Sequence, residues 1–178
     1  MNRSFFSIRF GLHETTLGLM LVAASPRGVC AIFLGDDSEF LVQALYKRFP
    51  KAEIFPATDD ADFARLLDDV TWLAEHPETS LEHSLDIYGT TFQQQVWQAL
   101  REIAPGETAS YAEIARRIDA PRAARAVAGA CAANPLAIVV PCHRVVHGDG
   151  SLSGYRWGVE RKRALLEKET QRVGKRGP

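Results

Sequence analysis

The sequence contains no long apolar run. Among its 178 residues, no stretch reaches the ~18 to 20 consecutive apolar residues that a membrane-spanning helix requires. The N-terminus also lacks the apolar core that follows the basic residues of a secretory signal. We therefore expect a cytoplasmic protein that has no contact with a membrane.

Cysteine is scarce, and its few copies lie far apart. Cys30, Cys131 and Cys142 are an odd number, which excludes a disulfide framework, and they include no C-x-x-C pair of the kind that holds zinc. Free thiols are typical of a reducing compartment. The sequence thus predicts no bound metal, and it carries no signature of another cofactor.

Charge is balanced over the whole chain but not within its halves. The formal net charge is −1. Residues 1–88 carry 7 Lys and Arg against 14 Asp and Glu, whereas residues 89–178 carry 14 against 8. This division leaves two possibilities open: the basic half binds a polyanion such as nucleic acid, or the charges are simply solvated.

The first half combines strand patterns with helical patterns. Apolar runs over residues 6–10, 17–24 and 29–34 are separated by turn residues, which predicts strands. Apolar residues at helical spacing then predict helices over about 38–49 and 60–76. No catalytic group of side chains stands out in this half.

A polar stretch at residues 77–84 predicts a linker, and the sequence beyond it is mostly helical. Residues 110–113 have the spacing of a capping box, and a further helix follows Pro121. Two short helices joined by a tight break have the outline of a helix-turn-helix. We expect an α+β protein with a small antiparallel sheet and its helices in residues 1–84, and a mostly helical domain in residues 85–178.

The most informative segment surrounds a cysteine. An apolar run over residues 138–140 leads to Pro141, Cys142 and His143. Because proline cannot donate a ladder hydrogen bond, a strand should end or bend there and present the cysteine at a pocket. A cysteine with a histidine and a carboxylate can act as an activated nucleophile, although free cysteine is also a common core residue. Adjacent side chains point apart in extended chain, so a bridging water would connect Cys142 to His143.

Residues 121–133 are dominated by alanine and glycine. Such a helix can pack closely on a neighbouring helix, or it can let an external partner approach. The minor groove of DNA is only ~6 Å wide, so bulky side chains would keep a helix out of it. Arg125 is expected to reach into the duplex and Arg122 to contact a phosphate. The expected contact residues beside them are Ala123, Ala124 and Ala126.

These segments resemble a known family. Residues 141–145 are similar to the active-site motif of the O6-alkylguanine-DNA alkyltransferases, also called methylated-DNA–protein-cysteine methyltransferases. The likeness continues at residues 110–111, 124–127, 134–135 and 153–158. Within the family it is similar to the C-terminal domain of bacterial Ada proteins, and it covers nearly the whole chain.

The resemblance implies a fold and an activity. The N-terminal half would be ribonuclease-H-like, and the protein would repair O6-alkylguanine, and O4-alkylthymine, in double-stranded DNA. It would transfer the alkyl group to its own cysteine once, without a cofactor, after flipping the base. The clustered cysteines of the zinc-holding Ada domain are not found here, so phosphotriester repair and transcriptional switching are not implied.

The resemblance also implies catalytic roles for matching residues. Cys142 would take the alkyl group, His143 would deprotonate it through a water, and Glu169 would orient the histidine. Tyr111 would serve the flipped guanine through its hydroxyl. Asn134 would tie the recognition helix to the active-site loop.

Other residues would hold the base and the duplex. Arg125 would fill the space that the flipped base leaves. Tyr155 and Arg156 match a loop that covers the guanine, and Val145 is expected in the same pocket. Trp157 follows in this loop, and we expect its large ring over or beside the pocket, where it would disfavour bulky aromatic substituents. The alternative is that the ring packs outward against the C-terminal helix near Leu165.

Three other hypotheses remain at this point. A helix-turn-helix regulator with a structural cysteine would need base-reading side chains on a helix that is mostly alanine. A lesion-binding protein without activity should lack the acceptor cysteine. A cysteine hydrolase has no use for the helix-turn-helix. The leading hypothesis is a monomer that acts on alkylated duplex DNA with little sequence preference.

Overall fold

The apolar runs near the N-terminus form antiparallel strands in the computed structural model, which describes residues 6–175. These strands are β1 (Ser7–Thr15), β2 (Gly18–Ser25) and β3 (Gly28–Gly35). At the second turn, a Cβ on Gly28 would lie 2.3 Å from the carbonyl oxygen of Ser84. Glycine is therefore required at position 28, because the backbone at Ser84 passes too close for a side chain.

A fourth strand makes the sheet mixed. β4 (Glu53–Pro56) pairs with β1 in the parallel direction, and the strand order is β3-β2-β1-β4. The expectation of a purely antiparallel sheet is wrong. The chain leaves β3, passes through helix α1 (Ser38–Arg48) and enters β4 at the opposite edge, and such a crossover returns a strand in the parallel direction.

Two helices pack on this sheet, and local capping fixes where they begin. α1 contacts β2 and β3, and α2 (Ala61–Glu75) contacts β1 and β2. The side chains of Asp37 and Asp60 accept hydrogen bonds from the backbone three residues ahead. Both helices lie within two residues of the ranges expected from the sequence.

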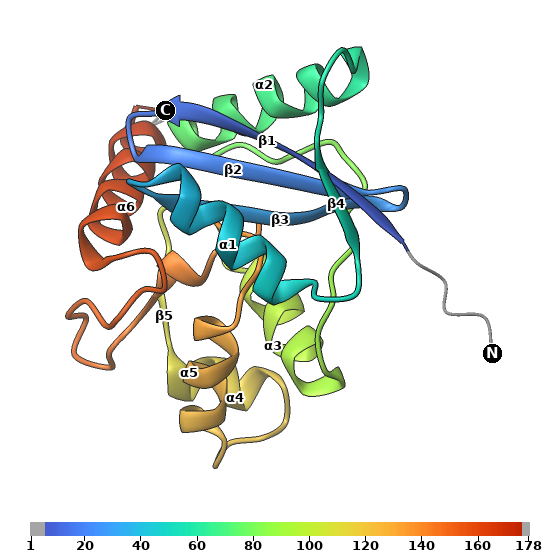
Figure 1. The fold of residues 1–178 in the computed structure, drawn as a ribbon. Coiled ribbons are helices and arrows are strands. Elements are labelled where there is room, and N and C mark those ends of the chain that lie inside the picture. Colours follow the sequence, from blue (N-terminus) through green and yellow to red (C-terminus); the bar gives the residue numbers. More distant parts are fainter. Residues whose placement is uncertain (1–5, 176–178) are drawn as a thin grey trace.

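The second half is mostly helical (Figure 1). Thr90 and Ser110 each form a complete capping box at the start of a helix. Residues 109–110, at the start of the helix that Ser110 caps, pair in parallel with residues 145–146, which follow shortly after Cys142. The elements are α3 (Thr91–Arg101), β5 (Ala109–Ser110), α4 (Tyr111–Arg117), α5 (Ala124–Ala132), the 3₁₀ turn Cys142–Arg144, β6 (Val145–Val146) and α6 (Val159–Gly174).

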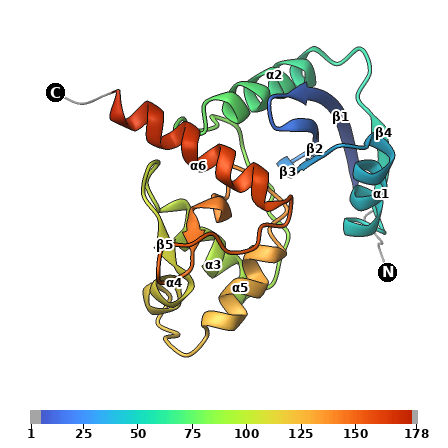
Figure 2. The same cartoon turned by 90° about the vertical axis from the view of Figure 1, so that its left-hand side faces the viewer.

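Helix α6 runs along the junction between the sheet and the other helices (Figure 2). The outer edge of β3 is closed by the second half of the chain, because Ile32 exchanges backbone hydrogen bonds with Pro135 and Ala137. The buried apolar residues of both halves form one continuous core. No helix within residues 6–175 is both long and apolar enough to span a membrane.

The apolar run before the cysteine is a turn, not a strand. Leu136 makes one bridge to Ile32, and the chain then folds back, with the Val140 N–H bonded to the Leu136 carbonyl. Ile138 has φ of 72°, which is rare for a β-branched residue. The run is apolar because its side chains belong to the shared core. Burial alone does not distinguish such a turn from a strand.

Candidate active site and its exposed basic helix

Cys142 lies at the wall of a cavity. It opens the 3₁₀ turn after Pro141 and is 4% exposed. The cavity has a volume of about 440 Å³, so the pocket expected beside the cysteine is present. Its lining residues are Tyr111, Ala128, Cys131, Ala132, Cys142, His147, Ser153, Gly154, Tyr155 and Arg156.

The Asn134 amide joins the end of α5 to the cysteine. Its Nδ2 donates to the Val140 carbonyl at 2.9 Å and to Cys142 Sγ at 3.2 Å, and its Oδ1 accepts from the Leu136 N–H at 2.9 Å. Asn134 is fully buried, so these bonds have no competition from water. One side chain therefore fixes the turn over residues 136–140 and offers the sulfur a donor.

A buried carboxylate holds the neighbouring histidine. Glu169 Oε1 lies 2.7 Å from His143 Nε2 and 2.7 Å from Arg144 Nη2. Arg144 also donates to the carbonyls of Ile103 and Pro77, at 2.6 and 3.1 Å. The Glu169 carboxylate is thus fixed in position, and through Arg144 it is connected to the linker between the two halves.

Burial and hydrogen bonds set the protonation states. Burial raises the pKa of Cys142 to about 11, against the opposing effects of Asn134 and Lys162. Burial also favours a higher pKa for Glu169, but hydrogen bonds from His143 and Arg144 bring it below its usual value. Desolvation lowers the pKa of His143 in spite of its carboxylate partner. The resting site therefore holds a thiol, a neutral imidazole and a carboxylate.

This arrangement leaves one ring nitrogen of His143 able to accept a proton. An ionised carboxylate only accepts hydrogen bonds, so Nε2, which faces Glu169, carries the ring proton. Nδ1 is then the acceptor, and it is buried with no hydrogen-bond partner among the described residues. A neutral imidazole with a free lone pair is the form that can take a proton from a thiol.

Tyr111 lines the same cavity, at the start of α4. Its hydroxyl donates to Ser153 Oγ at 2.6 Å, and burial raises its pKa. Ser153 in turn accepts from Lys162 Nζ at 2.8 Å. Neither Ser153 nor Lys162 was among the site residues expected from the sequence. A lysine among apolar positions of a helix was the available signal, because Lys162 lies seven residues before Glu169 and so on the same helix face.

Two residues expected in the pocket lie elsewhere. Tyr155 and Arg156 line the cavity, but Trp157 and Val145 do not. Trp157 is buried and lines a separate cavity of about 410 Å³ beside Phe33. Its ring meets the Tyr155 ring edge to face at 5.4 Å. The indole therefore lies beside the cavity, against Tyr155, and does not line it.

Val145 contributes to the site through its backbone. Its side chain is fully buried, and β6 pairs with β5 so that the residue belongs to the core. Its carbonyl accepts from Lys162 Nζ at 2.5 Å and from the Ser153 hydroxyl at 3.2 Å. Its place in the structure is therefore to support the wall and not to form it.

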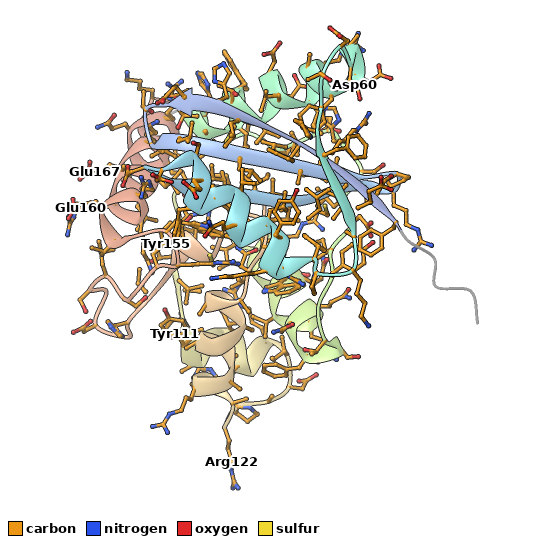
Figure 3. The ribbon with its side chains drawn as sticks, in the orientation of Figure 1. Asp60, Tyr111, Arg122, Tyr155, Glu160 and Glu167 are labelled. Carbon is orange, nitrogen blue, oxygen red and sulfur yellow. The ribbon has the colours of Figure 1, made fainter. Side chains whose placement is uncertain are left out.

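The alanine-rich helix α5 connects the surface to the cavity. Arg122, Arg125 and Ala126 are exposed, and Ala123 and Ala124 are half-buried. Arg122 projects away from the end of the molecule (Figure 3). The C-terminal part of the same helix lines the cavity through Ala128, Cys131 and Ala132.

The other face of α5 is held against α3. Trp97 Nε1 donates to the Ala130 carbonyl at 2.9 Å, and both residues are buried. The small side chains of α5 therefore have an effect on both faces of the helix. They allow close packing against α3 on the buried face, and they leave the exposed face without bulky protrusions. The two interpretations of this helix from the sequence are compatible.

Comparison with protein-family models identifies residues 91–171 as similar to the "6-O-methylguanine DNA methyltransferase, DNA binding domain". The chain is 53% identical over 165 residues to the "Bifunctional transcriptional activator/DNA repair enzyme Ada" of Escherichia coli. That match covers 93% of the chain but 46% of the Ada protein, so the chain spans about half the length of this relative.

Shorter relatives match over most of their length. The inducible "Methylated-DNA--protein-cysteine methyltransferase" of Bacillus subtilis is 39% identical over 151 residues, which are 83% of the chain and 82% of that protein. Among solved structures, the chain is similar to Mycobacterium tuberculosis OGT in complex with DNA. The TM-score is 0.76 at 36% identity, and the match covers 93% of this chain and 94% of that one.

Proposed function

The chain belongs to the 6-O-methylguanine-DNA methyltransferase family, and on that basis we propose that it repairs DNA by moving the alkyl group of an O6-alkylguanine onto Cys142. The observation that carries this proposal is the position of Cys142. Its sulfur lies at a cavity whose wall includes the C-terminal part of α5, and the N-terminal part of that helix carries the exposed Arg125.

Activation begins from the resting thiol. A water between Cys142 Sγ and His143 Nδ1 would carry the thiol proton to the imidazole, since Nδ1 has no other hydrogen-bond partner among the described residues. The imidazolium is stabilised by the ionised Glu169. The Asn134 amide stabilises the thiolate that forms, and a thiolate is the strong, soft nucleophile that attack on an alkyl carbon requires.

The departing guanine needs a proton donor, because it would otherwise leave as an anion. Tyr111 lines the same cavity, and its hydroxyl is a suitable proton donor to the leaving base. The product is a thioether at Cys142. Because sulfur bonded to two carbons is a poor leaving group, the thiol is not regenerated and each protein molecule acts once.

The reacting carbon lies inside the duplex, so the nucleotide must be flipped into the cavity. We assign Arg125 to the space that the base leaves and Arg122 to a phosphate, since both are exposed on or beside α5. In this proposal α4 and α5 act as a helix-turn-helix whose alanines permit close approach to the minor groove. The contact carries little sequence preference.

The finer parts of the proposal concern scope and organisation. O4-alkylthymine fits the same chemistry, since its alkyl carbon is also bonded to a ring-derived oxygen. We further propose a cytoplasmic monomer whose residues 1–84, a ribonuclease-H-like unit, support residues 85–178. The hydrogen bond from Arg144 to the Pro77 carbonyl supports this proposal, because it joins the site to the proposed linker.

Mass spectrometry tests the function directly. Incubation with a duplex that contains one O6-methylguanine should add one methyl group to the Cys142 peptide, in a one-to-one ratio with lesion removed. The methyl group should persist after the DNA is digested. A regulator or lesion binder would leave the mass unchanged, and a hydrolase would remain unmodified while consuming a test ester.

A further inference from the structure

Lys162 is a buried cation whose one effect in the chemistry above is to oppose the rise in the pKa of Cys142. It is fully buried on α6, and none of the ion pairs among residues 6–175 includes it. Its Nζ donates to three neutral oxygens, the Val145 carbonyl at 2.5 Å, Ser153 Oγ at 2.8 Å and the Gly154 carbonyl at 3.3 Å. Burying a charge without an opposite charge is costly, so its position calls for a functional explanation.

Ser153 connects this cation to the wall of the cavity. An ammonium group has only donors, so Ser153 Oγ must accept from Lys162. The same oxygen accepts from the Tyr111 hydroxyl at 2.6 Å, and its own proton goes to the Val145 carbonyl at 3.2 Å. A continuous hydrogen-bonded chain therefore runs from Lys162 through Ser153 to Tyr111.

We propose that Ser153 and Lys162 are positioning residues that replace the proton which Tyr111 gives to the departing guanine. This inference rests on the function proposed above. Tyr111 is the group that touches the base, and the other two residues act only through it. They keep Tyr111 an effective donor by removing the negative charge that would otherwise develop on its oxygen.

The proton and electron count closes without another reactant. The Cys142 thiolate forms a bond to the alkyl carbon, the bond from that carbon to the guanine oxygen breaks, and its electron pair stays on guanine. Tyr111 turns its O–H from Ser153 to the base and gives up the proton. Ser153 turns its O–H from the Val145 carbonyl to the phenolate and gives that proton, and Lys162 replaces it. The products are neutral guanine, a neutral amine and the thiol proton on His143.

The surroundings of Lys162 favour loss of its proton at the step in which the guanine departs. Burial lowers its pKa, and the negative charge of the Cys142 thiolate opposes that effect. Alkylation converts the thiolate to a neutral thioether, so the charge that retained the proton disappears when the base departs. If Lys162 were paired with a carboxylate, the negative charge beside it would remain after alkylation, and the lysine would keep its proton.

Ser153→Ala is the variant that tests the chain. It removes the hydroxyl that joins Lys162 to Tyr111. It leaves Lys162 two backbone acceptors and leaves the Tyr111 phenol in place. Losing a hydrogen bond to a charged group should slow single-turnover methyl transfer from duplex O6-methylguanine about 10- to 100-fold. Ser153→Thr should retain the rate because it keeps the hydroxyl. Ser151→Ala, an exposed serine of the same loop, is the matched control and should be unchanged.

A second electrophile separates leaving-group assistance from thiol activation. Iodoacetamide alkylates Cys142 with loss of iodide, which needs no proton. Ser153→Ala should therefore react with iodoacetamide at the wild-type rate. An equal loss with both electrophiles would show that Ser153 supports the thiolate or the fold and would overturn the proposal.

A double-mutant cycle tests whether the effect passes through the phenol. In a Tyr111→Phe background, Ser153→Ala should cause no further loss of methyl transfer. A loss as large as in the wild-type background would contradict the inference, as would a wild-type rate in Ser153→Ala. If the wild-type chain transfers no methyl group at all, the proposed function fails instead.

Discussion

At the scale of single residues, reactivity at Cys142 depends on what each polar neighbour can donate or accept. A fully buried thiol with a pKa of about 11 is a poor nucleophile at neutral pH. In the proposed mechanism, Asn134 and the His143–Glu169 pair lower the cost of forming the thiolate inside the cavity.

Cys142→Ser should abolish methyl transfer and leave DNA binding unchanged. A hydroxyl is a far weaker nucleophile than a thiolate, whereas α5 does not depend on the sulfur. Transfer is measured by peptide mass and binding by a gel-shift titration. Cys131→Ser, in the wall of the same cavity, is the matched control and should still transfer. Methyl groups on Cys131 or Cys30 in the Cys142 variant would show that the wrong thiol was chosen.

Glu169→Gln should lower stability and change its pH dependence. The pKa of Glu169 lies below the ordinary value of 4.5, so the folded state favours the carboxylate. Its contribution is present above about pH 4.5 and is lost as pH falls through the lower folded value. Breaking a buried pair on one side costs about 3 kcal/mol, so the variant should unfold more easily at pH 7.

Thermal unfolding from pH 7 to pH 3 measures this effect. The difference between wild type and Glu169→Gln should narrow below pH 4.5. Glu167→Gln, exposed on the same helix, is the control and should match the wild type throughout (Figure 3). A constant difference at every pH would mean that the carboxylate charge does not stabilise the fold.

At the scale of elements, α5 does two things with one sequence. Its exposed side carries Arg125 and Ala126, and its inner end contributes Cys131 to the cavity wall. A helix with larger side chains could not pack on α3 and still leave so low an outer surface. Because Asn134 follows directly, any displacement of α5 would be transmitted to Cys142.

Arg125→Ala should slow repair of duplex DNA much more than reaction with a free modified base. The free base needs no flipping, whereas unstacking in a duplex costs a few kcal/mol. Single-turnover rates on the two substrates measure the difference. Arg163→Ala, exposed on α6, should affect neither rate. Equal losses on both substrates would show that Arg125 does not occupy the space of the flipped base.

At the scale of the whole molecule, the two halves are unequal in charge and share one core. The acidic half contributes the β3 edge that holds Leu136, six residues before Cys142, and the Pro77 carbonyl that binds Arg144. The basic half presents α5. In the proposed function, the acidic half supports the site and the basic half contacts the DNA, so the two roles fall to halves of opposite net charge.

DNA binding should weaken steeply with salt, and Arg122→Ala should make that dependence shallower. Each neutralised phosphate contributes about 0.9 to the slope of log affinity against log salt concentration. Loss of one phosphate contact should therefore reduce the slope by about one, which fluorescence anisotropy between 50 and 200 mM salt can resolve. Arg65→Ala, exposed on α2, is the control. An unchanged slope for Arg122→Ala would place the duplex elsewhere.

Much of the local structure could be predicted from the sequence. Asp37, Asp60 and Ser110 mark helix starts because a capping side chain bonds to a backbone group only three residues away. Cys142 beside His143 was likewise recognisable, because the pair is contiguous. Features of this kind depend on residues within about one helical turn of each other.

Other features were decided only by contacts between distant parts of the chain. The apolar run over residues 138–140 predicts a strand but forms a turn, and the bridge just before it joins Leu136 to Ile32, about a hundred residues earlier in the chain. Trp157 lines a cavity together with Phe33 of β3, and Lys162 reaches Tyr111 through Ser153. Periodicity and capping determine which residues form each element, because their energies are local. Which buried polar groups meet is set by how the elements pack, and so only the tertiary structure decides it.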